Sequence, residues 1–343
     1  MFEQAIARLL VLAPAALFAL LLSLGLIALL RPWLVRHALA QPNARSSHRE
    51  PTPQGGGVAV VASTLMVVWA VLALSLSPGL PPDGQFLALT AAVVFLAVLG
   101  ALDDMHSVSA SARLAAQCLA VVAVVAVLPS ELRLVPQLPW WIERACLFLG
   151  WVWFINLVNF MDGIDWMTVA EVVPITGAMV VLGLFGVVEP RSALLAAELL
   201  GAMLGFAPFN RPVAKLFLGD VGSLPIGLLL GWLLLELAGQ GHLAAALILP
   251  LYYLADATTT LAHRIVRHEP FWRAHRTHFY QRATDAGLSV PAIVTRVFLL
   301  NLALATLALA TVAAASTAAS IAALAVAGAI AAWFLRALAR GNR

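Results

Sequence analysis

The sequence predicts an all-α, polytopic membrane protein. Of its 343 residues, 62% are hydrophobic and only 11% are charged, whereas roughly 25% of the residues of a soluble domain are charged. The apolar residues are gathered in long runs, and a run of roughly 20 residues crosses a bilayer as a helix. Because lipid satisfies no backbone hydrogen bonds, helices are the expected architecture.

About eleven apolar runs approach this length, and Pro or Gly separates most of them, as expected of tight turns between helices. The first run has no basic leader and no small-residue cleavage site, so we expect a retained helix. We expect a single integral-membrane domain over residues 1–343, without a soluble domain. The predicted helices lie near residues 9–30, 58–77, 85–102, 112–128, 140–158, 169–187, 192–208, 224–239, 243–262, 290–312 and 317–335.

The distribution of basic residues predicts how these helices are oriented. Short cytoplasmic loops of membrane proteins contain an excess of Arg and Lys. Every second gap between the predicted helices is rich in Arg, as is the C-terminal tail, whereas the N-terminus and the remaining gaps contain few basic residues. We therefore expect the N-terminus outside the cell and the C-terminus inside.

Five polar segments fall in the gaps that are predicted to face the cytoplasm. They bring carboxylates, amides and arginines to one face of the membrane, which suits an enzyme that handles an anionic, lipid-linked substrate. We expect active-site loops at residues 31–57, 103–113, 156–168, 209–223 and 263–289.

Asp103 and Asp104 follow an apolar helix, and Arg113 lies about two helical turns further on. Adjacent carboxylates repel each other, so the pKa of one should rise unless a cation or a metal offsets the charge. The alternative is a solvated helix end.

Asn156, Asn159, Asp162 and Asp165 recur at a spacing of three, which keeps successive side chains near one face of a helix end. Such a row suits Mg²⁺, which binds carboxylate and amide oxygens together with substrate phosphate. It suits equally the hydrogen bonds of a nucleotide base or sugar. The alternative is a capped helix terminus.

Asn210 and Asp220 bracket Lys215, and Asp220 lies between Gly219 and Gly222. Phosphate-binding loops often combine glycine with exposed backbone N–H groups. The sequence of this segment does not match a Walker loop, which excludes that mode of binding a nucleoside triphosphate. The alternative is a plain turn before the next helix.

The last segment is strongly basic and includes aromatic residues. Arginine makes bidentate contacts with phosphate oxygens, which suits a pyrophosphate, and the aromatic residues suit the membrane interface. The alternative is a cytoplasmic anchor that contacts lipid headgroups. The residues concerned are Arg264, Arg267, Phe271, Trp272, Arg273, His275, Arg276, His278, Tyr280 and Arg282.

Asp256 lies within a predicted membrane helix before this segment. A carboxylate in the membrane is costly, so a functional role is the default expectation. We expect Asp256 to line the active cavity as a substrate-binding residue. Structural pairing with Arg264 or a neighbouring residue is the alternative.

The segments PTPQGGG, DD, NxxNxxDGID, NRPVAKxFLGDVGS and HRTHFYQR occur in this order along the chain. In that order and topology, the chain resembles the polyprenyl-phosphate N-acetylhexosamine-1-phosphate transferases of glycosyltransferase family 4. That family includes enzymes that start O-antigen synthesis and the related phospho-muramoyl-pentapeptide translocase. HRTHFYQR is most similar to the O-antigen branch, part of lipopolysaccharide synthesis.

The resemblance implies a reaction in which polyprenyl (undecaprenyl) phosphate attacks the β-phosphate of a UDP-linked N-acetylated sugar, forming polyprenyl-diphosphate-sugar and UMP. In-line attack and an aspartyl-phosphate intermediate both fit the residues. The implied catalytic residues are Asp103, Asp104, Asp162 and Asp165. The implied substrate-binding residues are Arg113, Asn210, His275, Arg276 and His278. Asp220 and Asn159 would hold Mg²⁺, with Mn²⁺ as an alternative ion.

The expected location is the bacterial inner membrane, with a periplasmic N-terminus and an active site facing the cytoplasm. The expected partners are polyprenyl phosphate, a UDP-N-acetylated sugar, membrane lipid and a second copy of the chain in a homodimer, and no nucleic acid. A transporter or a flippase for lipid-linked sugars is the alternative function. Transporters usually have their sites near the bilayer midplane, whereas these polar segments share one face.

One segment departs from the family pattern. The family commonly continues DGIDGLA, whereas this chain reads DGIDWMT, with Trp166 and Met167 in place of a glycine and a small apolar residue. A Trp at this edge is expected to narrow the sugar or nucleotide pocket or to change the surface that the pocket presents, which leaves the identity of the donor sugar open.

Overall fold

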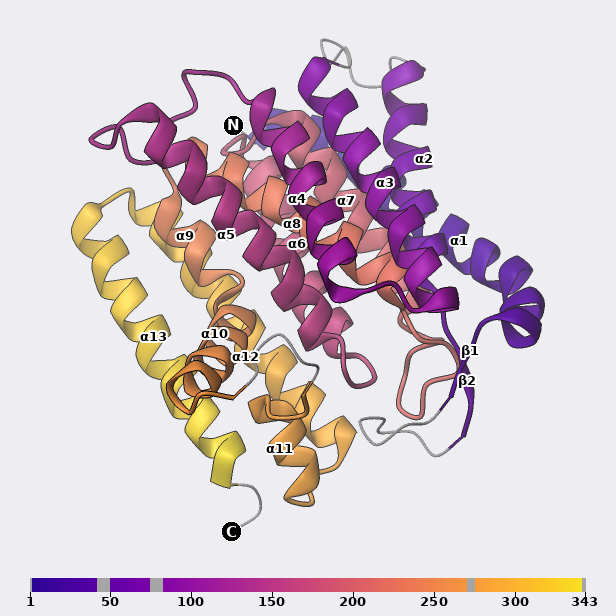
Figure 1. The fold of residues 1–343 in the computed structure, drawn as a ribbon. Helices are drawn as coiled ribbons and strands as arrows, with labels where there is room; N and C mark the ends of the chain where they lie inside the picture. The colour runs from indigo at the N-terminus through magenta and orange to yellow at the C-terminus, as the bar shows by residue number, and fades with distance from the viewer. Residues whose placement is uncertain (1, 42–49, 75–82, 270–274, 341–343) are drawn as a thin grey trace.

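A computed structural model shows a bundle of helices that run roughly along one direction (Figure 1). The structure describes residues 2–41, 50–74, 83–269 and 275–340. Several residues of the predicted loops lie outside the described part of the chain, namely His48, Arg49, Phe271, Trp272 and Arg273.

Each of the eleven apolar runs forms helix, which confirms the helical fold class. The helices are α1 (Phe2–His37), α2 (Gly57–Ala73), α3 (Gly84–His106), α4 (Ala110–Ala126), α5 (Trp140–Met161), α6 (Met167–Leu184), α7 (Pro190–Phe206), α8 (Asp220–Gly239), α9 (Leu243–Ile248), α10 (Leu251–Val266), α11 (Phe279–Asp285), α12 (Val290–Ala314) and α13 (Thr317–Arg340).

The ninth run differs from the prediction because it forms two helices rather than one. The helix α9 ends at Ile248 and α10 begins at Leu251, with Pro250 between them. Proline has no N–H to donate, and its ring clashes with the carbonyl of the preceding turn, so a continuous helix is broken here. The short helix α11 follows within the basic segment and was not predicted.

Among the residues that the structure describes, seven helices are long and apolar enough to cross a membrane, namely α1, α3, α5, α6, α8, α12 and α13. The helices α2 and α4 are apolar but shorter. The protein is therefore a multi-span membrane protein, and the count of eleven crossings stays a prediction. The two termini lie at opposite ends of the bundle, and the C-terminus shares its end with α11 and the β-hairpin (Figure 1).

The helix α8 is the centre of the bundle. In its most apolar stretch 89% of residues are buried, against 28% for α1 and for α13. Glycines let its neighbours approach closely, because a Cβ added at Gly57 would lie 2.2 Å from the Cα of Gly222, and one at Gly227 would lie 2.9 Å from the Cα of Ile155. Small residues at helix contacts are the usual means of close packing in membranes.

Local sequence explains where several helices begin. The carboxylate of Asp83 accepts a hydrogen bond from the backbone N–H of Phe86 at 2.9 Å, and Ser109 and Ser289 cap α4 and α12 in the same way. These residue types are preferred N-caps because they satisfy otherwise unpaired N–H groups. Pro190 begins α7, where its missing N–H costs nothing.

A short hairpin connects the end of α1 with the start of α2. Its strands, β1 (Leu39–Ala40) and β2 (Thr52–Pro53), pair antiparallel. Directly after β2, Gln54 forms a parallel bridge with Phe217. The first polar segment is thereby joined to the loop that precedes α8.

A polar contact inside the bundle connects α12 to α6. The amide nitrogen of Asn301 donates to Glu171 Oε2 at 2.6 Å and to the carbonyl of Ala170 at 2.9 Å. Hydrogen bonds between membrane helices satisfy polar groups that lipid cannot. Glu171 therefore has a structural explanation that its sequence position did not reveal.

The close approach of α3 to α8 yields a testable prediction. A Cβ added at Gly100 of α3 would lie 2.3 Å from the backbone of Asp220, so Gly100→Ala must push the two helices apart. We expect the free energy of unfolding to fall by about 1–3 kcal/mol, as is typical of overpacking, measured as a lower thermal midpoint of the detergent-purified protein.

Gly177→Ala in α6 is the matched control, because a Cβ at that helical glycine would meet nothing within 4 Å. Equal midpoints for the two variants would contradict the packing described for α3 and α8.

Candidate active site

A cavity of about 210 Å³ brings together six of the predicted site residues. They come from three polar segments: the end of α3, the end of α5 with its following loop, and the loop that leads into α8. The predicted residues that line the cavity are Asp104, Asn159, Asp162, Asp165, Asn210 and Asp220.

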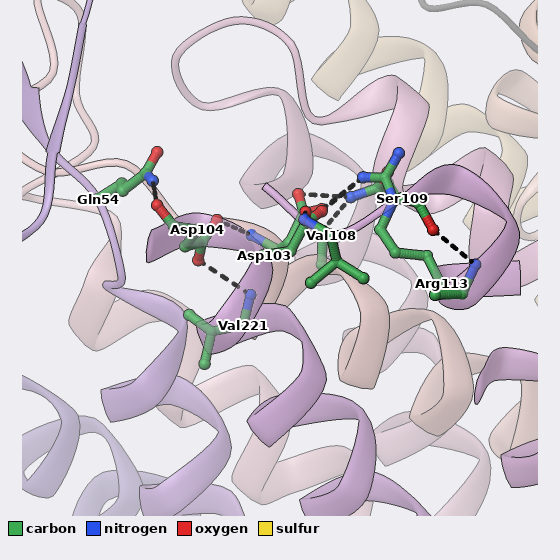
Figure 2. Close-up of polar contacts among 11 residues, drawn as sticks. Gln54, Asp103, Asp104, Val108, Ser109, Arg113 and Val221 are labelled. Atoms are coloured by element: carbon green, nitrogen blue, oxygen red, sulfur yellow. Dashed lines mark hydrogen bonds and ion pairs between the residues drawn. The ribbon is translucent and has the colours of Figure 1, made fainter. Parts of the chain in front are cut away.

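Asp104 joins the end of α3 to the start of α8 (Figure 2). Its carboxylate accepts hydrogen bonds from the backbone N–H groups of Asp220, at 2.9 Å, and Val221, at 3.2 Å. The positive end of a helix dipole favours such a carboxylate. Gly219, at φ 79°, allows this approach, because a Cβ there would lie 2.4 Å from the Asp104 carboxylate.

Arg113 bridges two acids at this junction. Its Nη1 atom lies 2.6 Å from Asp103 Oδ2 and 3.1 Å from Asp220 Oδ2. Asp103 also accepts a hydrogen bond from the backbone N–H of Val108 at 2.6 Å (Figure 2). The two adjacent acids thus have different partners: Asp104 caps α8, whereas Asp103 pairs with Arg113. The sequence led us to expect that a cation could offset the charge of one of these acids.

The row of amides and acids at the end of α5 does not form one helical face. Asn159 points to α8, where its Nδ2 atom donates to Asp220 Oδ1 at 2.8 Å and to Ser223 Oγ at 2.9 Å. Asn156 instead donates to Gln117 of α4 and is absent from the described lining of the cavity. The helix ends at Met161, so the spacing of three no longer sets the direction of the later side chains.

Asp162 and Asp165 lie in the loop after α5. Asp162 accepts a hydrogen bond from the hydroxyl of Thr168. Burial, and then the nearby carboxylates of Asp220 and Asp104, raise the pKa of Asp162 to about 8, although the Thr168 hydroxyl acts in the opposite direction. Asp165, only 5% exposed, accepts from the backbone N–H of Ala214 at 2.9 Å.

Asn210 holds this loop against the loop that precedes α8. Its Oδ1 atom accepts from the backbone N–H of Trp166 at 2.7 Å, and its Nδ2 atom donates to the carbonyl of Leu216 at 2.9 Å. The side chain is 7% exposed, so both hydrogen bonds are shielded from water. Asn210 therefore fixes two cavity loops relative to each other.

Trp166 has a backbone conformation that favours glycine, with φ 63°. This conformation gives a physical reason for the glycine that the family pattern leads one to expect here. The indole Nε1 donates to the carbonyl of Ala207 at the end of α7, at 2.6 Å. Trp166 is not among the described lining residues of the cavity, so the expected narrowing by its ring is not seen.

The predicted substrate-binding residues of the basic segment lie outside this cavity. Asp256 is fully buried and accepts from the backbone N–H groups of Phe279 and Tyr280, at 3.1 and 3.3 Å, while its Oδ1 lies 3.2 Å from His278 Nδ1. The structure thus makes Asp256 an anchor for the start of α11, and its structural partner is His278 rather than Arg264.

The side chains of His275 and Arg276 lie close to this anchor. The ring of His275 stacks on that of His278, with centroids 5.0 Å apart. Arg276 pairs with Asp285 at 3.1 Å. His275 is therefore held beside the start of α11, whereas Arg276 pairs with the last residue of that helix, and neither is among the described lining residues of the acidic cavity.

Three further residues shape the site, although sequence reasoning gave Gln54 and Ser223 no role and expected Tyr280, which is fully buried, at the membrane interface. Gln54 lines the cavity and donates to the carbonyl of Asp104 at 2.6 Å. Ser223 contacts Asn159, and the Tyr280 hydroxyl donates to the carbonyl of Phe160 at 3.1 Å. Gln54 and Ser223 belong to motifs that carry the resemblance, which was the one signal that could have found them.

The donor set of the cavity fits a divalent cation of the Mg²⁺ type. Its described lining contains four carboxylates and no basic side chain. Within the described ranges, no group of three or more His, Cys, Asp or Glu is arranged to hold a metal by itself. Mg²⁺ usually takes one or two carboxylates from a protein and completes its shell with water and substrate phosphate.

Asp220 and Asn159 are the residues that would hold such an ion. The structure turns the amide nitrogen of Asn159 toward Asp220. The two ends of an amide are exchanged when the group turns over, so the same side chain could present its oxygen to a cation.

The fold and this cavity define a multi-span helical membrane protein with an acidic site at the ends of its helices. The sequence of residues 86–238, from α3 to α8, matches the model of glycosyl transferase family 4.

Curated relatives agree with this match. A probable undecaprenyl-phosphate N-acetylglucosaminyl 1-phosphate transferase of Bacillus subtilis (strain 168) is 27% identical over 280 residues, which cover 77% of this chain and 74% of the relative. A phospho-N-acetylmuramoyl-pentapeptide-transferase of Pseudarthrobacter chlorophenolicus is 31% identical over 253 residues, or 57% of this chain and 68% of the relative. The chain belongs to glycosyl transferase family 4.

A third relative is a decaprenyl-phosphate N-acetylglucosaminephosphotransferase of Mycolicibacterium smegmatis. It is 30% identical over 220 residues, which cover 57% of this chain and 52% of the relative.

The two hydrogen bonds of Asn210 yield a second prediction. Asn210→Ala leaves the N–H of Trp166 and the carbonyl of Leu216 buried without these partners. We expect the free energy of unfolding to fall by about 1–3 kcal/mol, measured from thermal midpoints of the purified protein.

Asn210→Asp keeps the acceptor for Trp166, but it loses the donor to Leu216 and adds a carboxylate to an acidic, buried cavity, so it should not restore the stability of the parent. An alanine variant as stable as the parent would show that Asn210 does not hold the two loops together.

Proposed function

We propose that this protein transfers an N-acetylated sugar 1-phosphate from a UDP-sugar to polyprenyl phosphate, which yields polyprenyl-diphosphate-sugar and UMP. The observation that carries this proposal is the convergence of Asp104, Asn159, Asp162, Asp165, Asn210 and Asp220 on one cavity. The names of the relatives, which are transferases acting on prenyl phosphates or on a muramoyl-pentapeptide, support the same reaction class.

In the proposed reaction, an oxygen of the lipid phosphate forms a bond to the β-phosphorus of the UDP-sugar. The bond from that phosphorus to the bridging oxygen breaks, and UMP leaves with the electron pair. Two anions must meet, so the site has to offset negative charge. A bound Mg²⁺ would supply this neutralisation when held by Asp220 and Asn159.

The residues of the chain would position the reactants. Arg113 already contacts Asp103 and Asp220, so it is placed to offset charge at the rim of the cavity. The carboxylates of Asp103 and Asp104 accept hydrogen bonds from the chain itself. We therefore assign these two acids an orienting role, rather than that of a free nucleophile.

The donor is proposed to be a UDP-linked N-acetylhexosamine, and the product to start a cell-surface glycan such as the O-antigen. The resemblance of the HRTHFYQR segment to the O-antigen branch supports this assignment, and His278 and Tyr280 of the segment lie against the end of α5. A flippase is less well supported, because the cavity is formed from helix ends rather than from the middle of the bundle.

We further propose that the cavity faces the cytoplasm from the inner membrane of a bacterium. Two observations support this topology: the excess of Arg in the loops at the cavity end, and the bacterial origin of the relatives. Nucleotide sugars are cytoplasmic metabolites, so a donor would reach the site directly.

The reaction is tested with the purified full chain, polyprenyl phosphate, Mg²⁺ and a panel of UDP-N-acetylhexosamines. We expect UMP release that stops on chelation and returns with added Mg²⁺. Asp220→Asn removes a charge at the proposed metal position and should lower the rate by roughly a hundredfold or more. Absence of UMP with every donor would refute the proposed reaction.

Glu131→Gln is the charge-matched control, because Glu131 is exposed in the loop after α4, away from the cavity. Thermal midpoints of both variants separate a lost function from a lost fold. A fully active, folded Asp220→Asn protein would remove Asp220 from the metal site.

The topology is tested with reporters fused after the C-terminus. A fluorescent protein that folds only in the cytoplasm should fluoresce, and an alkaline phosphatase active only in the periplasm should stay inactive. The opposite pattern would place the cavity on the outer face of the membrane.

A further inference from the structure

A second cavity, of about 320 Å³, lies between the end of α10 and the start of α11. Its lining includes His263, Arg264, Arg267 and Arg282, and it shares no described lining residue with the acidic cavity. The Asp256–His278 contact lies next to it, since Thr260 and Phe279 of its wall both hydrogen-bond to Asp256. The basic segment therefore forms a site of its own, separate from the acids.

The charges of this second cavity favour an anion. Glu269 pairs with Arg264 at 2.8 Å, which leaves Arg267 and Arg282 as cations that form no ion pair within the described ranges. The guanidinium of Arg282 lies over the ring of Phe279, 5.7 Å from its centroid, which holds the group in place. Two arginines at one hollow suit phosphate oxygens, to which guanidinium groups make bidentate hydrogen bonds.

The surroundings of the cavity favour the surface of a membrane. Ile265 and Val266 lie between Arg264 and Arg267 at the end of α10, and they are 49% and 77% exposed. Exposed apolar side chains beside cations are typical of a helix end at the lipid interface, where the apolar parts contact acyl chains and the charges reach the headgroups.

We propose that this second cavity binds a phosphate group, and that the group is the headgroup of an anionic phospholipid. The site goes beyond the transfer reaction, because none of its cations lines the cavity in which the acids converge. It would attach the start of α11 to the membrane surface and so keep the loop that carries His275, Arg276 and His278 at the level of the lipid phosphate.

The full chain in mild detergent is titrated with phosphatidylglycerol or with zwitterionic phosphatidylcholine, and bound lipid is counted by native mass spectrometry. We expect tighter binding of phosphatidylglycerol. Arg267→Gln combined with Arg282→Gln should lower that affinity by roughly tenfold or more, because each interfacial cation contributes to the attraction. Both side chains are exposed, so the variant should keep its thermal midpoint.

Arg336→Gln combined with Arg340→Gln is the matched control, since both residues are exposed at the end of α13 and the same charge is removed. Unchanged phosphatidylglycerol binding in the cavity variant, or an equal loss in the control, would overturn the site. Free UDP is the second probe. We expect that UDP does not displace phosphatidylglycerol from the protein. If UDP displaces the lipid and binds less tightly to the cavity variant than to the parent, the cavity binds the phosphate of the nucleotide, and the lipid assignment is wrong.

Discussion

The hydrogen bonds from the start of α8 to Asp104 are the contact on which the site depends. The carboxylate of Asp104 accepts hydrogen bonds from two backbone N–H groups there. Gly100 and Gly219 let α3 and the start of α8 approach closely enough for these hydrogen bonds. This capping places Asp220 at the first position of the central helix. From that position Asp220 reaches both Arg113 and Asn159, so three segments of the chain meet at one carboxylate.

Convergence of acids carries an electrostatic cost that the protein offsets in different ways. Asp104 is stabilised by backbone N–H groups and Asp103 by Arg113, whereas Asp162 has a neutral hydroxyl as its partner. Burial and the neighbouring carboxylates disfavour the ionised form of Asp162, and its pKa is raised for this reason. A site of this kind favours the arrival of positive charge, and a cation accompanied by substrate phosphates would relieve the repulsion among the carboxylates.

Acidic and basic side chains line two separate cavities at this end of the bundle. Acids line the cavity at the ends of α3, α5 and α8, while the arginines of α10 and α11 surround a different hollow. The buried Asp256, with its hydrogen bonds to His278 and α11, stands between these regions. The arginines of the second hollow therefore lie apart from the acids of the first cavity, of which Asp220 pairs with Arg113 instead.

The sequence by itself determined the helical membrane fold, the polar segments and the residue types of the site, because apolar runs of membrane length and carboxylate-rich loops are local features. It also placed Asp104, Asn159, Asp162 and Asp220 in one site, through their resemblance to a family. Only the tertiary structure decided that Asn156 points to α4, that Asp256 anchors α11, that Trp166 turns toward α7 and that Pro250 divides a predicted helix. The direction of a side chain beyond a helix end depends on loop contacts between residues far apart in the chain, and no local spacing encodes those contacts.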